Sequence, residues 1–235
     1  MAKYNRVLLK LSGEALAGAN KNGYDFTIMG QICDVIKDCV AQGVQVGVVI
    51  GGGNFWRGVK NGEGYIERTR ADRMGMLATV MNCLAVCDVL EQKGVPARVL
   101  AAAQMPTFAE YYTHERAVKL LSDGKVVLFA GGTGHPFFST DTGTVLRAAE
   151  IGADVILLAK NIDGVYSADP AKDPTAVKYD EIGYDEVLAK RLGVMDLTAT
   201  SLAMDNRIPV YVFALKDPRN ILRVAAGENV GTLVH

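Results

Sequence analysis

Lysine and glycine residues follow three apolar runs of this sequence, a combination that could bind phosphate groups. Lys10, Ser12 and Gly13 close the first run, VLLKLSG, and six of the 25 glycines form two clusters, at 51–53 and at 131, 132 and 134. Glycine turns let backbone N–H groups converge on an anion, and a following helix adds its positive end. An unpaired ammonium on Lys10 would be costly to bury among apolar residues, so we expect a bound phosphate to relieve that cost.

Other kinds of chemistry lack their signatures. The sequence contains neither G-x-x-x-x-G-K-[ST] nor G-x-G-x-x-G, which argues against P-loop and Rossmann mechanics. Its histidines are 114, 135 and 235, and no G-x-S-x-G elbow accompanies them, which argues against a Ser–His hydrolase. The cysteines at 33, 39, 83 and 87 have neither zinc-site nor C-x-x-C spacing, so we expect reduced thiols in the core.

Composition favours a small-molecule ligand. The chain has 25 Lys plus Arg against 26 Asp plus Glu, so no basic excess indicates nucleic acid or an anionic membrane as the main partner. Lys10 and Glu14 interrupt the N-terminal apolar stretch, and no apolar run approaches the roughly 20 residues that span a bilayer. We therefore expect a cytoplasmic protein.

Six short apolar runs must position the glycine turns. They are nearly continuous rather than alternating, as in strands covered on both faces, and span 6–12, 44–50, 97–101, 125–130, 154–159 and 209–214. Helical spacing predicts one helix over 28–40, with Gly43 as its C-terminal cap, and another from Asp72 to Gln92. Its expected apolar positions are Met76, Leu77, Val80, Met81, Leu84 and Val89.

The order of these elements predicts one α/β domain over residues 1–235, a three-layer αβα sandwich with a mostly parallel central sheet. Ligands of such sheets bind outside the carboxyl ends of the strands, so the three glycine turns should meet at one edge. The polar segment 58–71 is expected to be a long mobile loop beside them.

Six segments of the sequence together resemble the bacterial uridylate kinases, which have the amino acid kinase fold. They are KLSGEAL (10–16), VGVVIGGGNFWRG (46–58), DRMGMLATVMN (72–82), TGHPFFSTDT (133–142), NIDGVYSADP (161–170) and VMDLTA (194–199). The resemblance runs from Arg6 to Val234 in one order without large gaps. It implies transfer of the ATP γ-phosphoryl group to UMP, giving UDP for pyrimidine nucleotide biosynthesis, with Mg²⁺ carried on the nucleotide phosphates.

The resemblance also implies a role for each matching position. Lys10 and Asp141 would be catalytic, the aspartate orienting the lysines and the metal-bearing phosphates. ATP would be bound by Lys10, Leu11, Ser12, Gly13, Gly53, Arg57, Asn161, Tyr166 and Asp169. UMP would be bound by Gly52, Asp72, Thr133, Gly134, His135, Pro136, Phe137, Phe138, Ser139 and Thr140. No residue is expected to ligate a resident metal ion.

The chemistry of these side chains suits that division. Arg57 offers a fork to phosphate oxygens, and Asp72 is an acceptor-only carboxylate fit for ribose hydroxyls. His135 stands where the family commonly has Asn, which leaves open a histidine-dependent pH effect on UMP binding.

Assembly and regulation also follow from the resemblance as expectations. It implies a homohexamer built as a trimer of dimers, activation by GTP, and inhibition by UTP in the UMP pocket. Cys87 and Glu91 stand where basic side chains serve the GTP site of relatives, although Arg98 and Lys125 remain. A carboxylate beside a triphosphate is repulsive, so we expect weak or absent GTP activation.

Two alternatives stay open. A kinase of a small carboxylate or carbamate, such as an acetylglutamate or carbamate kinase relative, could share the fold. Asp72 and the run TGHPFFSTD argue against it, because those substrates lack a ribose and a base. A non-enzymatic nucleotide-binding or oxyanion-storage protein should have lost Lys10 or Asp141, and both are present.

Overall fold

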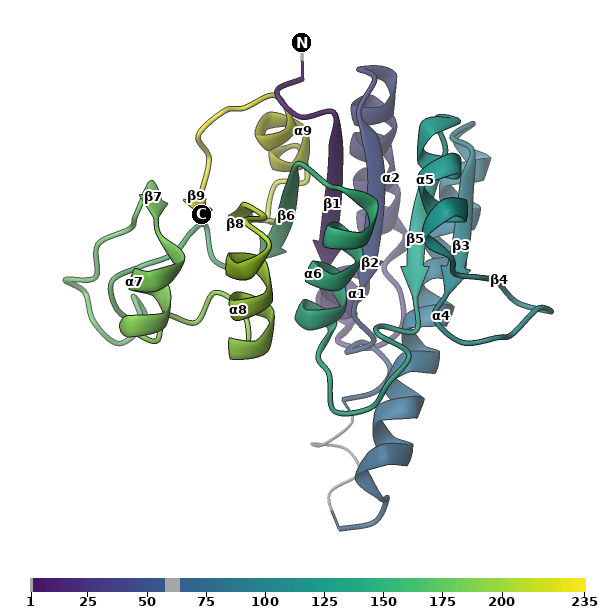
Figure 1. Cartoon of the computed structure of the whole chain (residues 1–235), viewed down its shortest axis with the longest axis horizontal. Helices are drawn as coiled ribbons and strands as arrows, with labels where there is room; N and C mark the ends of the chain where they lie inside the picture. The colour runs from purple at the N-terminus through teal and green to yellow at the C-terminus, as the bar shows by residue number, and fades with distance from the viewer. Residues whose placement is uncertain (1, 58–63) are drawn as a thin grey trace.

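The computed structural model describes residues 2–57 and 64–235. Within them, nine strands form one sheet in the order β4-β3-β5-β2-β1-β6-β8-β9-β7, with helices on both faces (Figure 1). Every pair of neighbours is parallel except β8 and β9. The strands are β1 (Arg6–Leu11), β2 (Gln45–Ile50), β3 (Ala97–Ala101), β4 (Glu110–Tyr111), β5 (Val126–Ala130), β6 (Val155–Lys160), β7 (Glu181–Ile182), β8 (Val210–Ala214) and β9 (Thr232–Val234).

The helices divide between the two faces of the sheet. One core contains residues of α1, α2, α4 and α9, and the other contains residues of α5, α6, α7 and α8. Along β1, Val7 and Leu9 face the first core and Leu8 faces the second, which explains why the strands are continuously apolar. The helices are α1 (Gly13–Ala17), α2 (Phe26–Ala41), α4 (Arg68–Gln92), α5 (His114–Ser122), α6 (Thr140–Ile151), α7 (Tyr184–Ala189), α8 (Leu197–Asp205) and α9 (Asn220–Ala225), with a 3₁₀ turn η1 (Gly18–Asn20).

The predicted α/β sandwich is confirmed, and the six expected strands match β1, β2, β3, β5, β6 and β8 to within one residue at each end. The short strands β4, β7 and β9 were not predicted, because two or three residues carry no periodic signal. Gly43 follows the end of α2 with φ of 84°, as expected for a residue that closes a helix.

The predicted inward face of α4 is partly wrong. Leu77, Met81 and Leu84 are 56%, 49% and 38% exposed, whereas the buried positions include Val80 and the polar Asn82. Apolar side chains project from every side of this helix, so periodicity could not identify the face that meets the sheet. The cysteine prediction holds better: Cys33, Cys39 and Cys83 are buried, Cys87 is partly buried, and all four are free thiols.

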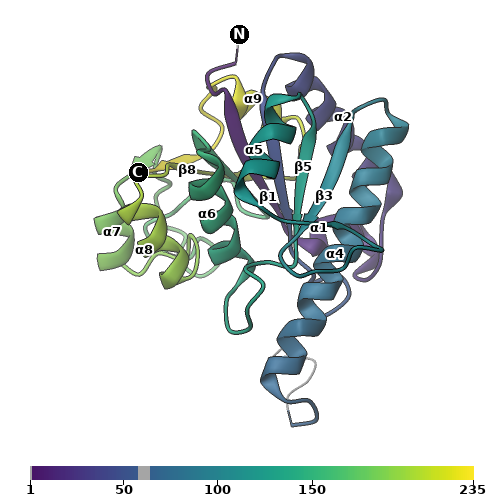
Figure 2. The same cartoon turned by 45° about the vertical axis from the view of Figure 1, so that its right-hand side comes forward.

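Helix α4 also begins earlier than predicted. Glu67 caps it by accepting a hydrogen bond from the Thr69 N–H, so residues 68–71 are helical rather than part of the expected loop. The rest of that expected loop falls partly on 58–63, outside the described residues. Figure 2 shows the N-terminal half of α4 extending beyond the sheet.

By length and composition alone, α4 would be long and apolar enough to cross a membrane, with a mean hydropathy of 1.5 over 18 residues. The expectation that no apolar run approaches the length needed to span a bilayer was therefore wrong for α4. The signal is weak evidence for a membrane, because core helices pass the same test, and α4 packs against β2, β3, β5 and α2.

Candidate active site

The three glycine turns lie side by side. They follow β1, β2 and β5, which are consecutive neighbours in the sheet, so the expected meeting at one edge is confirmed. The second turn runs directly against α4: a Cβ on Gly52 would lie 2.7 Å from the Gly75 carbonyl oxygen and 2.8 Å from the Ala78 Cβ. Only glycine fits there, because any side chain would push the turn away from the helix.

A pair of buried asparagines joins this turn to α4. Asn54 and Asn82 are fully buried and exchange two amide hydrogen bonds, of 3.0 and 2.8 Å. Asn82 also donates to the Gly51 carbonyl (2.7 Å) and Asn54 to the Gly23 carbonyl (2.9 Å). Sequence reasoning missed this pair, although an asparagine within an apolar helix is a signal that a buried partner is needed.

The predicted catalytic pair is in direct contact. Lys10 lies near the end of β1 and Asp141 in the first turn of α6, and the lysine Nζ lies 2.8 Å from the carboxylate. Their side chains are 13% and 19% exposed, so solvent screens the pair only partly. Lys10 was expected to need a compensating charge, and Asp141 supplies one in addition to any phosphate that binds there.

A second lysine, which sequence reasoning did not single out, faces this pair. Lys160 ends β6, the strand beside β1. Burial lowers the pKa of the Lys160 ammonium, Asp141 opposes that shift, and Lys10 adds to it. Lysine directly after the apolar run VILLA was the available signal, and it is the same kind of signal as Lys10 in VLLKL.

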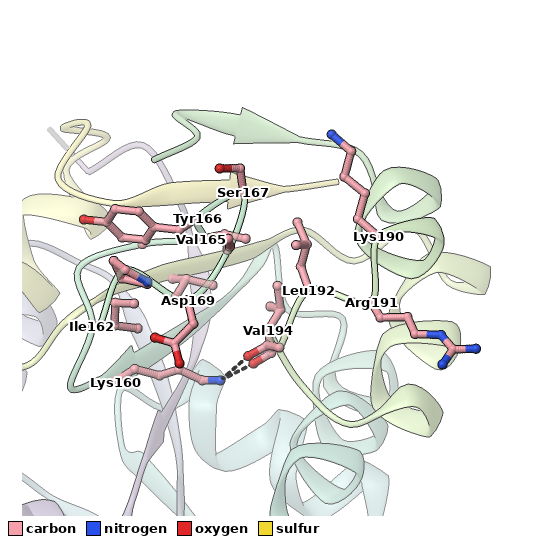
Figure 3. Close-up of a pocket in the computed structure, with 15 residues that line it drawn as sticks. Lys160, Ile162, Val165, Tyr166, Ser167, Asp169, Lys190, Arg191, Leu192 and Val194 are labelled. Carbon is pink, nitrogen blue, oxygen red and sulfur yellow. Dashed lines mark hydrogen bonds between the residues drawn. The ribbon is translucent and has the colours of Figure 1, made fainter. Parts of the chain in front are cut away.

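The Lys160 ammonium also has backbone partners. It donates to the carbonyl oxygen of Val194 and, at 3.3 Å, to that of Gly193 (Figure 3). Two lysines and one aspartate therefore converge where β1 and β6 end, and both lysines would face phosphate oxygens placed there.

Each of three cavities is lined by at least one of these two lysines. The first, of about 380 Å³, is lined by Asp72 and the glycine turns and is called here the Asp72 cavity. The second, of about 430 Å³, contains both Lys10 and Lys160 and is called the lysine cavity. The third, of about 450 Å³, is called the Tyr166 cavity. Lys10 and Ser12 line the first two, and Lys160 lines the last two, so the cavities form a continuous series.

Most of the predicted site residues line this series. Those in the Asp72 cavity are Lys10, Ser12, Gly13, Gly52, Gly53, Arg57, Asp72, Thr133, His135, Phe138, Ser139 and Thr140. Asn161 lines the lysine cavity, and Tyr166 and Asp169 line the third.

Five predicted residues do not line the series. Asp141 meets it through its contact with Lys10, which lines two of the cavities. The side chain of Leu11 is buried in the core, so only its backbone could face a ligand. Gly134, Pro136 and Phe137 do not line the Asp72 cavity, and Phe137 is 64% exposed.

Glu14 was not predicted, although it lines both the Asp72 and lysine cavities. It forms an ion pair with Arg57. A phosphate entering beside Arg57 would compete with this carboxylate for the guanidinium.

Asp72 holds the loop over 133–139 against α4. Its carboxylate accepts from the Phe137 N–H (2.9 Å) and pairs with Arg68 Nε (2.9 Å) one helical turn away. Phe137 has φ of 70°, a conformation unfavourable for a bulky residue, and this hydrogen bond helps to hold it. Both contacts use the same carboxylate oxygen, Oδ2, and within residues 2–57 and 64–235 no hydrogen bond engages Oδ1.

The acid groups do not form a metal cage. Among residues 2–57 and 64–235, no group of three or more His, Cys, Asp or Glu side chains is placed to hold a metal ion. Asp141 supplies a hard carboxylate oxygen of the kind that Mg²⁺ accepts, and Mg²⁺ in phosphate sites is commonly held by one or two carboxylates together with phosphates. The residues present therefore fit an ion that arrives on a nucleotide.

Fold and site together define an α/β protein whose cavities lie at the carboxyl ends of its strands and are lined by lysines and glycine turns suited to phosphate groups. Residues 5–214 match the amino acid kinase family, and the chain belongs to that family. The resemblance seen in its sequence segments and the prediction that it is a kinase are thereby confirmed.

Solved structures of UMP kinases are similar along the whole chain. The enzyme from Bacillus anthracis is 40% identical with a TM-score of 0.95, covering 99% of this chain and 96% of its own. The Ureaplasma parvum UMP kinase is 34% identical with a TM-score of 0.93, covering 99% of both chains. The uridylate kinase of Archaeoglobus fulgidus is 32% identical with a TM-score of 0.75, covering 100% of both chains.

Proposed function

We propose that this kinase transfers the γ-phosphoryl group of ATP to UMP, giving UDP and ADP. The observation that carries the proposal is the series of adjoining cavities lined at its centre by Lys10 and Lys160, with Asp141 paired to Lys10. Two nucleotides bound from opposite ends would bring their phosphates together at these residues. The similarity to UMP kinases over 99% of the chain supports UMP as the acceptor.

UMP would occupy the Asp72 cavity. Oδ1 of Asp72 would accept from the ribose hydroxyls, and the loop over 133–140 would contact the pyrimidine. The turn at Gly52 and the N-terminus of α6 would face the UMP phosphate, and Gly53 would face the phosphates of ATP.

ATP would enter from the other end. Its adenosine would lie in the Tyr166 cavity beside Tyr166 and Asp169, with Asn161 nearer the phosphates. Ser12, Gly13 and Arg57 would contact the phosphate chain as it reaches Lys10.

Phosphoryl transfer depends mainly on positioning and charge neutralisation, and little covalent chemistry falls to the protein. Lys10 and Lys160 would neutralise charge on the transferring group from two sides, and Asp141 would orient both ammonium groups. Magnesium carried by the phosphates would supply further neutralisation. We expect no proton relay, because UMP presents an ionised phosphate oxygen as the nucleophile.

The test is an ADP-release assay in which UMP, CMP, dUMP and N-acetylglutamate are compared as acceptors. UMP should give the highest kcat/KM, and a Lys10→Ala preparation measured in parallel controls for contaminating kinases. Preference for N-acetylglutamate would favour the small-carboxylate alternative, and no acceptor-dependent ADP release would favour the non-enzymatic one.

The proposal extends to assembly and setting. We propose a cytoplasmic homohexamer in pyrimidine biosynthesis, in which UTP competes with UMP for the Asp72 cavity. The supporting observation is an apolar stripe on the outer face of α4, made of Met74, Leu77, Met81 and Leu84, which are all at least 38% exposed.

A further inference from the structure

The segment 193–196, between α7 and α8, contacts both sides of the proposed reacting centre. On one side, the carbonyls of Gly193 and Val194 accept from the Lys160 ammonium (Figure 3). On the other, the carboxylate of Asp196 reaches the start of α6, the helix that carries Asp141. Val194 and Asp196 belong to the VMDLTA segment, for which the proposed function has no role.

The Asp196 carboxylate lies at the N-termini of two helices. Its Oδ1 caps α8 by accepting from the Ala199 N–H at 2.9 Å. Its Oδ2 accepts from the Ser139 hydroxyl, and the Thr142 hydroxyl lies 3.3 Å from both oxygens. A negative charge at this point is favoured by the positive ends of both helices.

Ser139 passes this contact on to the backbone of α6. Its hydroxyl oxygen caps α6 by accepting from the Thr142 N–H at 3.1 Å, while its hydrogen is donated to Asp196. Thr142 is 4% exposed, so its hydroxyl depends on Asp196 for a partner in place of water. Asp141 stands between these two anchored residues, so their positions determine where its carboxylate points.

We propose that Asp196 is a positioning residue for phosphoryl transfer, which acts through Ser139 and Thr142 to hold Asp141 against Lys10. The carbonyls of Gly193 and Val194 hold the Lys160 ammonium beside that pair. Asp141 pairs directly with Lys10, whereas Asp196 contacts Ser139 and Thr142, so the effect of Asp196 on the reaction would be indirect. The inference rests on the proposed function, because it assumes that Lys10, Asp141 and Lys160 carry the reaction.

The primary test compares Asp196→Asn and Asp196→Ala with the wild-type enzyme. Asparagine is an equally good helix cap, so Asp196→Asn should keep α8 while presenting an amide donor to Ser139. We expect kcat to fall at least about tenfold in Asp196→Ala and by less in Asp196→Asn, with KM for ATP changing by less than about threefold in both.

Thr113→Ala is the matched control for the loss of a cap. Thr113 caps α5 by accepting from the Arg116 N–H and lies outside the three cavities, so this variant should lose thermal stability but keep its kcat. An equal fall of kcat in Thr113→Ala would show that lost stability alone explains Asp196→Ala, and would overturn the proposal.

A double-mutant cycle tests the route of the effect. Thr142→Val removes the hydroxyl with little change of shape. If Asp196 acts through the Thr142 hydroxyl, the kcat of the double variant Asp196→Asn/Thr142→Val should be nearly that of whichever single variant has the lower kcat. Fully additive losses, or an unchanged kcat in folded Asp196→Asn and Asp196→Ala, would overturn the proposal. The assay uses whichever acceptor the wild-type enzyme turns over fastest, so failure of UMP would contradict the proposed function without deciding the role of Asp196.

Discussion

The partly buried ammonium of Lys160 is itself an indication of a functional site. Its ammonium is largely removed from water and lies near a second cation, Lys10. Such burial destabilises the folded protein unless paired charges and hydrogen bonds compensate for it, because desolvation of an ion costs several kcal/mol even after relaxation. Its partners, Asp141 and two backbone carbonyls, hold the charge where phosphate oxygens would arrive.

Replacing this lysine should separate activity from stability. We expect Lys160→Met to lower kcat at least about a hundredfold, because it removes a cation from the developing phosphoryl charge. The folded pKa of Lys160 lies below the unfolded one, so at neutral pH the charged side chain opposes folding, and stability due to this group rises as pH passes from the folded to the unfolded pKa. Thermal unfolding at neutral pH should therefore show no loss of stability, and a clear drop in Tm would contradict this account.

Asp72 has two tasks, since it holds the Phe137 N–H and is proposed to bind the ribose. Asp72→Ala should raise the KM for UMP by an amount equivalent to about 1–3 kcal/mol while the KM for ATP stays nearly constant. Arg68→Ala is the matched control, because it removes the ion pair but keeps the carboxylate. The measurement is steady-state kinetics with each nucleotide varied in turn. A rise in the KM for ATP alone would contradict the assignment of Asp72 to UMP binding.

At the scale of elements, the attachment of the glycine turn to α4 depends on the Asn54–Asn82 pair. Asn82→Ala would leave the Asn54 side chain and the Gly51 carbonyl without their partner in a fully buried position. We expect unfolding in urea to show a loss of about 3 kcal/mol, within the range for unsatisfied buried polar groups. Asn206→Ala, at an exposed helix end, should cost less than about 1 kcal/mol; an equal cost at both positions would refute the argument.

At the scale of the whole molecule, the exposed apolar stripe on α4 makes a prediction about assembly. Leu77→Glu would place a charge at the centre of the proposed subunit contact, where burying it unpaired is costly. Light scattering at micromolar concentration should give a lower mass for this variant than for the wild type. Val177→Glu, at another apolar position that is 65% exposed, should leave the mass unchanged. A monomeric wild-type protein would exclude the proposed assembly.

Regulation by GTP belongs to the same scale. Glu91 pairs with Arg98 at 2.6 Å, so one of the remaining cations near the expected GTP site is already engaged. We therefore expect millimolar GTP to change the initial rate little at subsaturating UMP. Glu91→Arg should create activation, and Glu91→Gln, which only removes the negative charge, should create less. A several-fold activation of the wild type would contradict the prediction.

The sequence alone determined six of the nine strands, the presence of the two long helices and the three glycine turns. Their signals are local: a strand covered on both faces must be apolar at every position, and a tight turn beside a phosphate or a helix requires glycine. Lys10 stood out for the same reason, because a cation within an apolar run needs a partner wherever it lies. The resemblance to known kinases then supplied the roles of most site residues.

Only the tertiary structure decided which partners these residues find. It showed that Asp141 pairs with Lys10, that Lys160 joins them, and that Asp196 reaches α6 from a different segment. It also showed which face of α4 meets the sheet. Each of these facts depends on contacts between segments distant in the chain, and periodicity along one segment does not record what packs against it.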